Sequence, residues 1–287
     1  RLVARSLRRQ DKSLIQLPIG VQEYWWPGLL IPLCLKDSSA VLVLSVKHRR
    51  RLLQCELLRL KKQGFNISIW EGSDPPPDDQ VWLLDCKGFI CAFKNGYLEG
   101  KQLIIPEAEL LCGRLREAMS IGVSSSDWEL LRRAHPVVDA GCLEIYQRLS
   151  KRLFTYSTCA DAQVVINKAE VLPLYDLLNL LGSCPSPWPE LLTAINQDWA
   201  SWGQLNHKML DWYWHLQPLE PFRYLQDLFA SCPVLMLAGS WQNDLLVSEL
   251  KSIDFEFNVS MKLGGPINQE PIPLFAPLHQ PMPNTEY

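Results

Sequence analysis

Short apolar runs alternate with amphipathic stretches along the first 112 residues of the chain. One such stretch, at 48–64, repeats leucine at helical spacing and ends at Gly64, which is typical of a helix and its C-cap. The runs are apolar at nearly every position, as in the strands of a parallel sheet that is buried on both faces. They occupy residues 13–17, 40–45, 65–70, 81–85 and 102–106. The pattern therefore predicts an α/β fold in which helices cover both faces of a parallel sheet.

The middle of the chain, 113–230, has a different pattern. Its apolar positions recur at helical spacing, and Trp199, Trp202 and Trp212 share one such stripe. We therefore predict an all-helical insertion there. Strand-like runs return at 233–239 and 254–263. The expected organisation is a first α/β part at 1–112, the insertion at 113–230, a second α/β part at 231–263 and a proline-rich connector at 264–287.

Composition narrows the class of protein. Hydrophobic residues make up 47% of the 287 residues, which is ample for one large domain or two smaller ones. The net charge of −3 excludes a surface that is basic overall, so any binding of nucleic acid must use a local patch. The longest apolar run, 25–35, contains two prolines and is too short to span a bilayer, so no membrane is expected.

The cysteines and the start of the chain bear on cofactor and compartment. Nine cysteines are present, an odd number, and no two have the C-x-x-C spacing of a metal site. We interpret them as buried free thiols in a reducing compartment, and no bound metal is expected. Because no signal peptide is visible, the sequence predicts a cytoplasmic protein.

The stretch LPIGVQEYWWPGLL has the frame of a phosphate-binding loop without the side chains that hold phosphate. A strand-like run precedes it, Pro18 and Gly20 open it, and a helical pattern follows. Its next positions are Gln22, Glu23 and Tyr24, where such a loop has a glycine, a lysine and a hydroxyl-bearing residue. By itself the stretch also fits an ordinary turn between a strand and a helix.

Two further stretches continue this order along the chain. Pro106-Glu107-Ala108-Glu109 begins at the end of one strand-like run, and Ala238-Gly239-Ser240-Trp241 begins near the end of another. Together with 18–24, they resemble the motifs in the first motor domain of superfamily 2 helicases, most closely those of the DinG-like branch. The resemblance implies a RecA-like P-loop NTPase fold, an ATP-dependent DNA helicase with ATP and Mg²⁺ as cofactors, and a second motor domain of the same chain. The proline-rich 264–287 is similar to the segment that leads into that second domain.

The departures from the family pattern bear on ATP. Under the resemblance, Glu23 replaces the phosphate-binding lysine, Tyr24 the Mg²⁺-binding hydroxyl, and Pro106 the Mg²⁺-binding aspartate. Exchanging Lys for Glu changes the charge interaction by up to ~8 kcal/mol, as much as the whole binding free energy of a micromolar ligand. We therefore expect no nucleotide cofactor. Glu107, which matches the acid that positions water in the family, is interpreted as a remnant of the catalytic site.

A basic run, Lys47-His48-Arg49-Arg50-Arg51, follows the second strand-like run. In the resembled family the loop at this place contacts the backbone of single-stranded DNA, and basic side chains there suit phosphate. Single-stranded or duplex DNA is therefore the expected partner. The alternative is a solvated helix face whose charges pair with neighbouring acids.

The sequence supports three hypotheses about function. In the first, the chain is the first motor lobe of a DinG-like protein that has lost ATP hydrolysis and acts as a nucleic-acid-binding or scaffold module. In the second, it is part of an active ATP-dependent DNA helicase once joined to its second lobe. In the third, it is an unrelated doubly wound α/β binding protein, whose ligand would still lie near 18–24 and 106–109 at the carboxyl ends of the strands.

Overall fold

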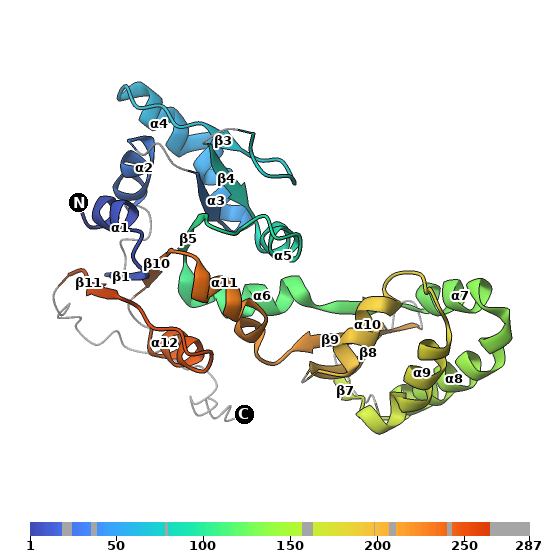
Figure 1. Ribbon diagram of the computed structural model, residues 1–287. Helices are drawn as coiled ribbons and strands as arrows, with labels where there is room; N and C mark the ends of the chain where they lie inside the picture. Colours follow the sequence, from blue (N-terminus) through green and yellow to red (C-terminus); the bar gives the residue numbers. More distant parts are fainter. Residues whose placement is uncertain are drawn as a thin grey trace, which may run out of the picture.

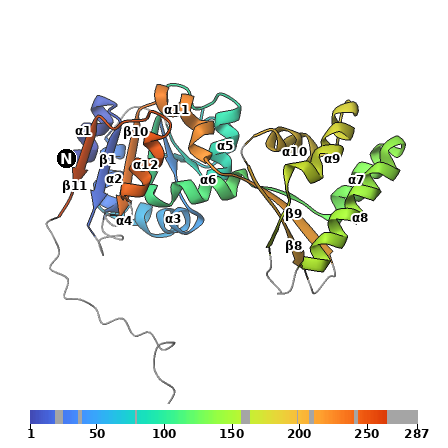
Figure 2. The same cartoon turned by 90° about the horizontal axis from the view of Figure 1, so that it is seen from below.

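The computed structural model describes residues 1–18, 25–35, 39–77, 80–156, 163–197, 199–206, 211–239 and 243–264. Two sheets organise this part of the chain, a parallel sheet of seven strands and an antiparallel sheet of four, which lie side by side (Figures 1 and 2). The predicted connector lies outside the described residues from position 265 onward. None of the described helices is both long and apolar enough to cross a membrane.

The large sheet is parallel throughout, with the strand order β11-β1-β10-β5-β2-β4-β3. Its inner strands are buried at nearly every position, which explains why their sequences are apolar without alternation. The strands are β1 Ser13–Leu17, β2 Ala40–Val43, β3 Ile69–Trp70, β4 Val81–Leu84, β5 Gln102–Pro106, β10 Val234–Gly239 and β11 Val259–Lys262. The predicted parallel sheet is confirmed.

Helices cover both faces of this sheet, as predicted, and each face has its own hydrophobic core. One layer packs against strand residues such as Leu42 and Leu235, and the other against their neighbours Val41 and Met236. The first layer contains α1 Leu2–Arg9, α2 Trp26–Cys34, α3 Val46–Arg51, η1 Leu52–Glu56 and α4 Leu57–Lys62. The second contains α5 Cys86–Lys94, α6 Leu111–Met119, α11 Gln226–Ser231, α12 Asn243–Lys251 and the 3₁₀ turns η2 Ala108–Leu110 and η4 Pro221–Leu225.

The helix predicted at 48–64 is present as one run from 46 to 62, with a π-helical segment, η1, at its centre. Gly64 follows this run with a φ of 82°, a left-handed conformation that suits the residue after a helix C-cap. The run belongs to the same core as α1 and α2, so these helices form one layer over the sheet.

The insertion contains a four-stranded antiparallel sheet with the order β6-β9-β8-β7, so the prediction of an all-helical insertion is wrong. The segment predicted as a continuous helix includes two paired strands in which successive side chains alternate between faces. Trp212 and Trp214 lie in a core with helices, whereas Tyr213 points the other way and is 37% exposed. The strands are β6 Ile121–Val123, β7 Gln163–Val165, β8 Trp199–Asn206 and β9 Asp211–Pro218.

Four helices pack against the inward face of this small sheet and form a third core rich in tryptophan. They are α7 Ser125–Ala134, α8 Asp139–Tyr156, α9 Lys168–Leu180 and α10 Trp188–Ile195, with the 3₁₀ turn η3 Pro136–Val138 before α8. Gly203 of β8 faces Leu153 of α8, and a Cβ at position 203 would overlap that leucine, so glycine permits the close approach. The eight cysteines within the described residues are all free, but Cys55 and Cys91 are exposed, so the prediction that the thiols are buried is wrong for these two.

Candidate functional site

The carboxyl ends of the parallel strands form one edge of the large sheet, where open α/β folds place their ligands. The strands β1, β5 and β10, which lead into the three stretches that carry the family resemblance, end there side by side, because β10 lies between β1 and β5, with Leu17 opposite Gly239 and Leu237 opposite Pro106. Ser240 and Trp241 of the third stretch lie outside the described residues. Pro18 directly follows β1. The other predicted loop positions lie outside the described residues: Gly20, Gln22, Glu23 and Tyr24.

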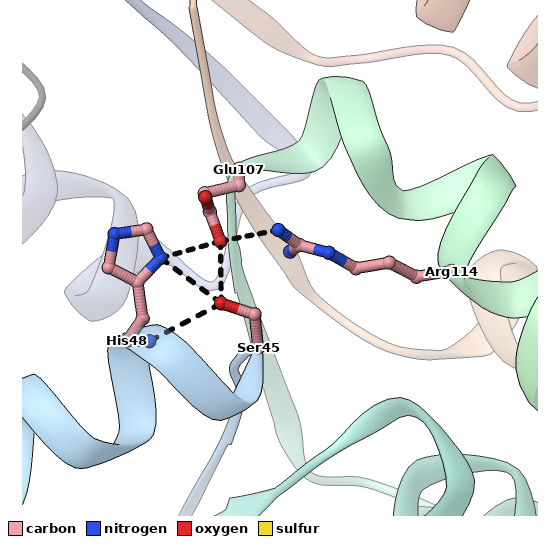
Figure 3. Close-up of polar contacts among 4 residues, drawn as sticks. All are labelled: Ser45, His48, Glu107 and Arg114. Atoms are coloured by element: carbon pink, nitrogen blue, oxygen red, sulfur yellow. Dashed lines mark hydrogen bonds and ion pairs between the residues drawn. The ribbon is translucent and has the colours of Figure 1, made fainter.

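Glu107 is the first residue after β5 and the centre of a polar cluster at this edge (Figure 3). Its backbone is left-handed, with φ 55° and ψ 43°, which is uncommon for a residue other than glycine. One carboxylate oxygen, Oε2, lies 2.6 Å from His48 Nδ1, 2.7 Å from Arg114 Nη2 and 3.1 Å from the Ser45 hydroxyl. We call these four residues the Glu107 cluster.

Three elements bring the Glu107 cluster together. Ser45 follows β2 and caps α3, because its hydroxyl accepts a hydrogen bond from the backbone N–H of His48 at 3.3 Å. The His48 ring turns toward the sheet edge and meets Trp26 edge-on, with ring centroids 5.7 Å apart. Arg114 reaches the same carboxylate from the first turn of α6. A strand end and two helices therefore hold the Glu107 carboxylate in place.

Burial alone would raise the pKa of the Glu107 carboxyl, but hydrogen bonds and charges of His48 and Arg114 outweigh it, so the pKa lies below its usual 4.5. Glu107 is thus an anion at neutral pH with an oxygen that is already occupied, and both features make it a weak base toward water. His48 Nδ1 also lies 3.3 Å from the Ser45 hydroxyl. The Ser45 hydroxyl and the Glu107 carboxylate both contact Nδ1 of His48. In a serine–histidine–acid relay the serine and the acid contact different ring nitrogens, so this geometry does not fit such a relay.

The predicted basic run divides into inward and outward residues. His48 belongs to the Glu107 cluster, and Arg49 and Arg51 each pair with a glutamate, at 2.7 Å and 3.0 Å. Lys47 and Arg50 are exposed, and neither forms an ion pair within the described part of the chain. Part of the run is therefore a helix face whose charges pair with neighbouring acids, as in the alternative interpretation. Lys47 and Arg50 of α3 remain exposed to solvent.

A pocket of about 410 Å³ lies beside the Glu107 cluster, between the carboxyl ends of β2 and β4. Lys87 and Arg114 contribute positive charge to its wall, and Asp85 and Glu117 contribute negative charge. Asp85 is engaged, because its carboxylate accepts a hydrogen bond at 2.7 Å from a backbone N–H of α5. Burial raises the pKa of Cys86 to about 11, so its thiol is protonated at neutral pH and is no nucleophile. The lining residues are Leu44, Ser45, Val46, Asp85, Cys86, Lys87, Arg114, Glu117 and Ala118.

Sequence reasoning identified two members of the Glu107 cluster, Glu107 and His48, and missed Ser45 and Arg114. A serine at a strand-to-helix junction is a recognisable cap signal, so Ser45 could have been found. Arg114 carries no such signal, because its role depends on how α6 packs. Within the described residues, no three His, Cys, Asp or Glu side chains lie together in a way that could hold a metal ion.

Comparison with known proteins identifies the fold. No family model matches the sequence, and no curated protein matches it. The similar solved structures include Xpd4 from S. tokodaii, with a TM-score of 0.53 and 11% identity, and an apo form of XPD, with a TM-score of 0.54 and 12% identity. The similarity covers 91% of this chain in both cases, and 58% and 57% of those chains. The large sheet with its flanking helices thus has the RecA-like fold of these two proteins, as predicted, and the chain spans less than two thirds of their length.

Proposed function

We propose that this chain is the first motor lobe of a DinG-like DNA helicase family protein that has lost ATP binding and hydrolysis and acts as a nucleic-acid-binding or scaffold module. The observation that carries the proposal is that the Glu107 carboxylate is already held by hydrogen bonds and ion pairs. The acid that would position the attacking water has its Oε2 within hydrogen-bonding distance of three donor groups. Pro106 precedes it where the resembled family has a Mg²⁺ ligand, and its side chain offers no donor atom.

The nucleotide does not fit the residues at this edge. A phosphate–Mg²⁺ grip needs a lysine, a hydroxyl and an aspartate together. The sequence has Glu23, Tyr24 and Pro106 at the matching positions. Releasing Glu107 to act on water would also leave Arg114 without its carboxylate partner, which lies 2.7 Å away. The substitutions at Glu23 and Tyr24 and the hydrogen bonds of Glu107 come from separate parts of the chain, and both support the loss of ATP binding and hydrolysis.

Titration calorimetry with ATP and Mg²⁺ tests this proposal. We expect no binding heat in the micromolar range, because the charge reversal at Glu23 alone is worth up to ~8 kcal/mol. A Glu23→Lys, Tyr24→Thr, Pro106→Asp variant serves as the comparison, since it restores the three side chains of the grip. Micromolar affinity in the unaltered chain would contradict the proposal and favour the active helicase as the alternative.

Binding of DNA along the carboxyl edge is the second part of the proposal. Lys47 and Arg50 of α3 are exposed and form no ion pair with any residue that the structure describes, and Lys87 and Arg114 line the adjacent pocket. Phosphate contacts of this kind position a strand without reading its sequence. A module of this type would hold DNA for the second motor domain of the chain or for another protein.

A Lys47→Gln, Arg50→Gln double variant is expected to bind single-stranded DNA more weakly than the unaltered protein. Two phosphate contacts are lost, so the slope of log affinity against log salt should fall by about 1.4. The measurement is fluorescence anisotropy with a labelled oligonucleotide over a range of salt. Lys94→Gln, Lys251→Gln is the matched control, because both lysines are exposed in the last turns of α5 and α12. A slope equal to that of the control would reject the carboxyl edge as the contact surface.

A further inference from the structure

Positive charge is concentrated in one part of the chain. The first 64 residues contain thirteen Lys and Arg against four Asp and Glu, although the whole chain has a net charge of −3. The described residues of this segment form β1, β2 and the helices α1, α2, α3, η1 and α4, and these helices form the layer on one face of the large sheet. The helices and 3₁₀ turns of the other face contain six Lys and Arg against five Asp and Glu, whereas α1, α2, α3, η1 and α4 contain ten against one. The excess of positive charge therefore lies on one face of the large sheet.

The outer side of α1 carries most of this charge in an ordered form. Arg1 occupies the N-cap position, and Arg5, Arg8 and Arg9 follow at helical spacing, so the four arginines line one side of α1. All four are exposed, and within the described ranges none of them forms an ion pair. We call them the arginine stripe. The opposite side of α1 packs into the protein through Leu7, which is 2% exposed.

Repulsion among the four guanidinium groups suggests that the arginine stripe binds an anionic partner. Like charges three and four residues apart repel each other and destabilise a helix, so the arrangement is unfavourable for the free protein. A polyanion would convert the repulsion into attraction. At 1.5 Å per residue, the stripe from Arg1 to Arg9 is about 12 Å long, the distance that three or four phosphates of a nucleic-acid strand cover along the helix axis. Guanidinium groups also bind phosphate through paired N–H donors.

The position of the stripe connects it with the carboxyl edge of the sheet. Arg1 lines a pocket together with Pro18 and Leu263, which follow the ends of β1 and β11. The start of α1 therefore lies at this edge, and the helix runs from there to the turn that precedes β1 at Ser13. Figures 1 and 2 show α1 on the outer side of the large domain, beside α2 and away from the insertion.

We propose that the arginine stripe of α1 binds the phosphodiester backbone of nucleic acid, as a second contact surface that extends the carboxyl edge down the side of the domain. An anionic membrane is the less suitable partner. Helices that lie on membranes insert apolar side chains beside their basic face, whereas the apolar side of α1 is buried in the protein. This inference rests on the binding of nucleic acid in the proposed function and adds a surface that the family resemblance does not assign.

An Arg5→Gln, Arg8→Gln, Arg9→Gln variant tests the proposal, with anisotropy of a labelled oligothymidine of roughly 30 nucleotides as the readout. Removing three phosphate contacts should lower the slope of log affinity against log salt by about 2 and weaken binding at least ~10-fold at about 0.1 M salt. The control variant Lys94→Gln, Lys168→Gln, Lys251→Gln removes the same charge from exposed positions elsewhere and should bind like the unaltered protein. Arg5→Lys, Arg8→Lys, Arg9→Lys keeps the charge and should keep the slope.

Three outcomes would overturn the proposal. If the glutamine variant binds with the affinity and slope of the control, the stripe does not contact nucleic acid. If, in addition, the Lys47→Gln, Arg50→Gln variant binds the oligonucleotide more weakly than its control, the proposed function stands and only the stripe is rejected. If the glutamine variant loses sedimentation with phosphatidylserine vesicles while its oligonucleotide binding is unchanged, the partner is a membrane. Circular dichroism of each variant checks that α1 remains folded.

Discussion

A Trp214→Ala substitution is expected to destabilise the insertion by about 3–5 kcal/mol, the usual cost of removing a large aromatic side chain from a core. Trp214 is fully buried on the inward face of β9. Its ring stacks on Trp128 at 6.4 Å, and its Nε1 donates a hydrogen bond to the Ser201 hydroxyl at 2.9 Å. The alanine variant would leave a cavity between sheet and helices and an unpaired hydroxyl. Urea unfolding followed by tryptophan fluorescence measures the loss.

Tyr213→Ala is the matched control for Trp214→Ala. Tyr213 is the preceding residue on the same strand, but its side chain points to the outward face and is 37% exposed. We expect a loss below about 1 kcal/mol, as for most exposed positions. The contrast between neighbours is a property of a strand, in which side chains alternate. Similar losses at the two positions would contradict the β-hairpin of β8 and β9.

The insertion shows why a periodic pattern can be misread. Trp199, Trp202, Leu205 and Trp212 recur at helical spacing, and on that ground the sequence predicts a helix. The segment 211–218 also alternates, with every second residue buried. A short aromatic-rich segment can fit both the helical and the strand period. Whether it becomes a strand depends on the neighbouring strands with which it pairs. β9 satisfies its backbone groups against β8 and β6, and these partners are not part of the local pattern.

The large sheet was predictable for the opposite reason. Its inner strands are covered on both faces, so they are apolar at successive positions and cannot be confused with amphipathic helices. The helix at 46–62 was also predictable, because its leucines follow one face and Gly64 ends it. In both cases the signal lies within a single segment. No long-range partner had to be known.

The Glu107 cluster combines a predictable part with an unpredictable one. Glu107 was identified through the family resemblance of the stretch 106–109, and His48 through a run of basic residues. The contact between them at 2.6 Å joins positions 59 residues apart and follows from the adjacency of β2 and β5. Sequence reasoning therefore placed His48 among the residues that contact DNA, whereas the structure turns it inward. Two neighbours from the same run, Lys47 and Arg50, keep the exposure that such contacts need.

A Glu107→Gln substitution is expected to destabilise the protein by about 1–3 kcal/mol. Removing one partner of a buried ion pair costs about 3–5 kcal/mol, and the side-chain exposure of 22% reduces that figure, since water screens the charges that remain. The glutamine would leave Arg114 without a carboxylate, although its size and shape are preserved. Glu109→Gln is the control, because Glu109 lies two residues away and its Oε2 has no hydrogen-bond partner among the described residues. We expect that variant to be as stable as the unaltered protein or slightly more so.

The pH dependence of this difference follows from the lowered pKa of Glu107. A carboxyl whose pKa is lower in the folded than in the unfolded state stabilises the fold above the unfolded value, near 4.5, and loses that contribution as the pH falls through the folded value. The stability gap between the unaltered protein and Glu107→Gln should therefore be constant from neutral pH down to about 4.5 and close below it.

The sign of the stability gap also separates the two functional hypotheses. An acid held ready for catalysis is commonly strained or poorly paired, so neutralising it stabilises the protein, whereas an acid retained for structure leaves the protein weaker when it is neutralised. A Glu107→Gln variant more stable than the unaltered chain would contradict the structural role and favour an active site.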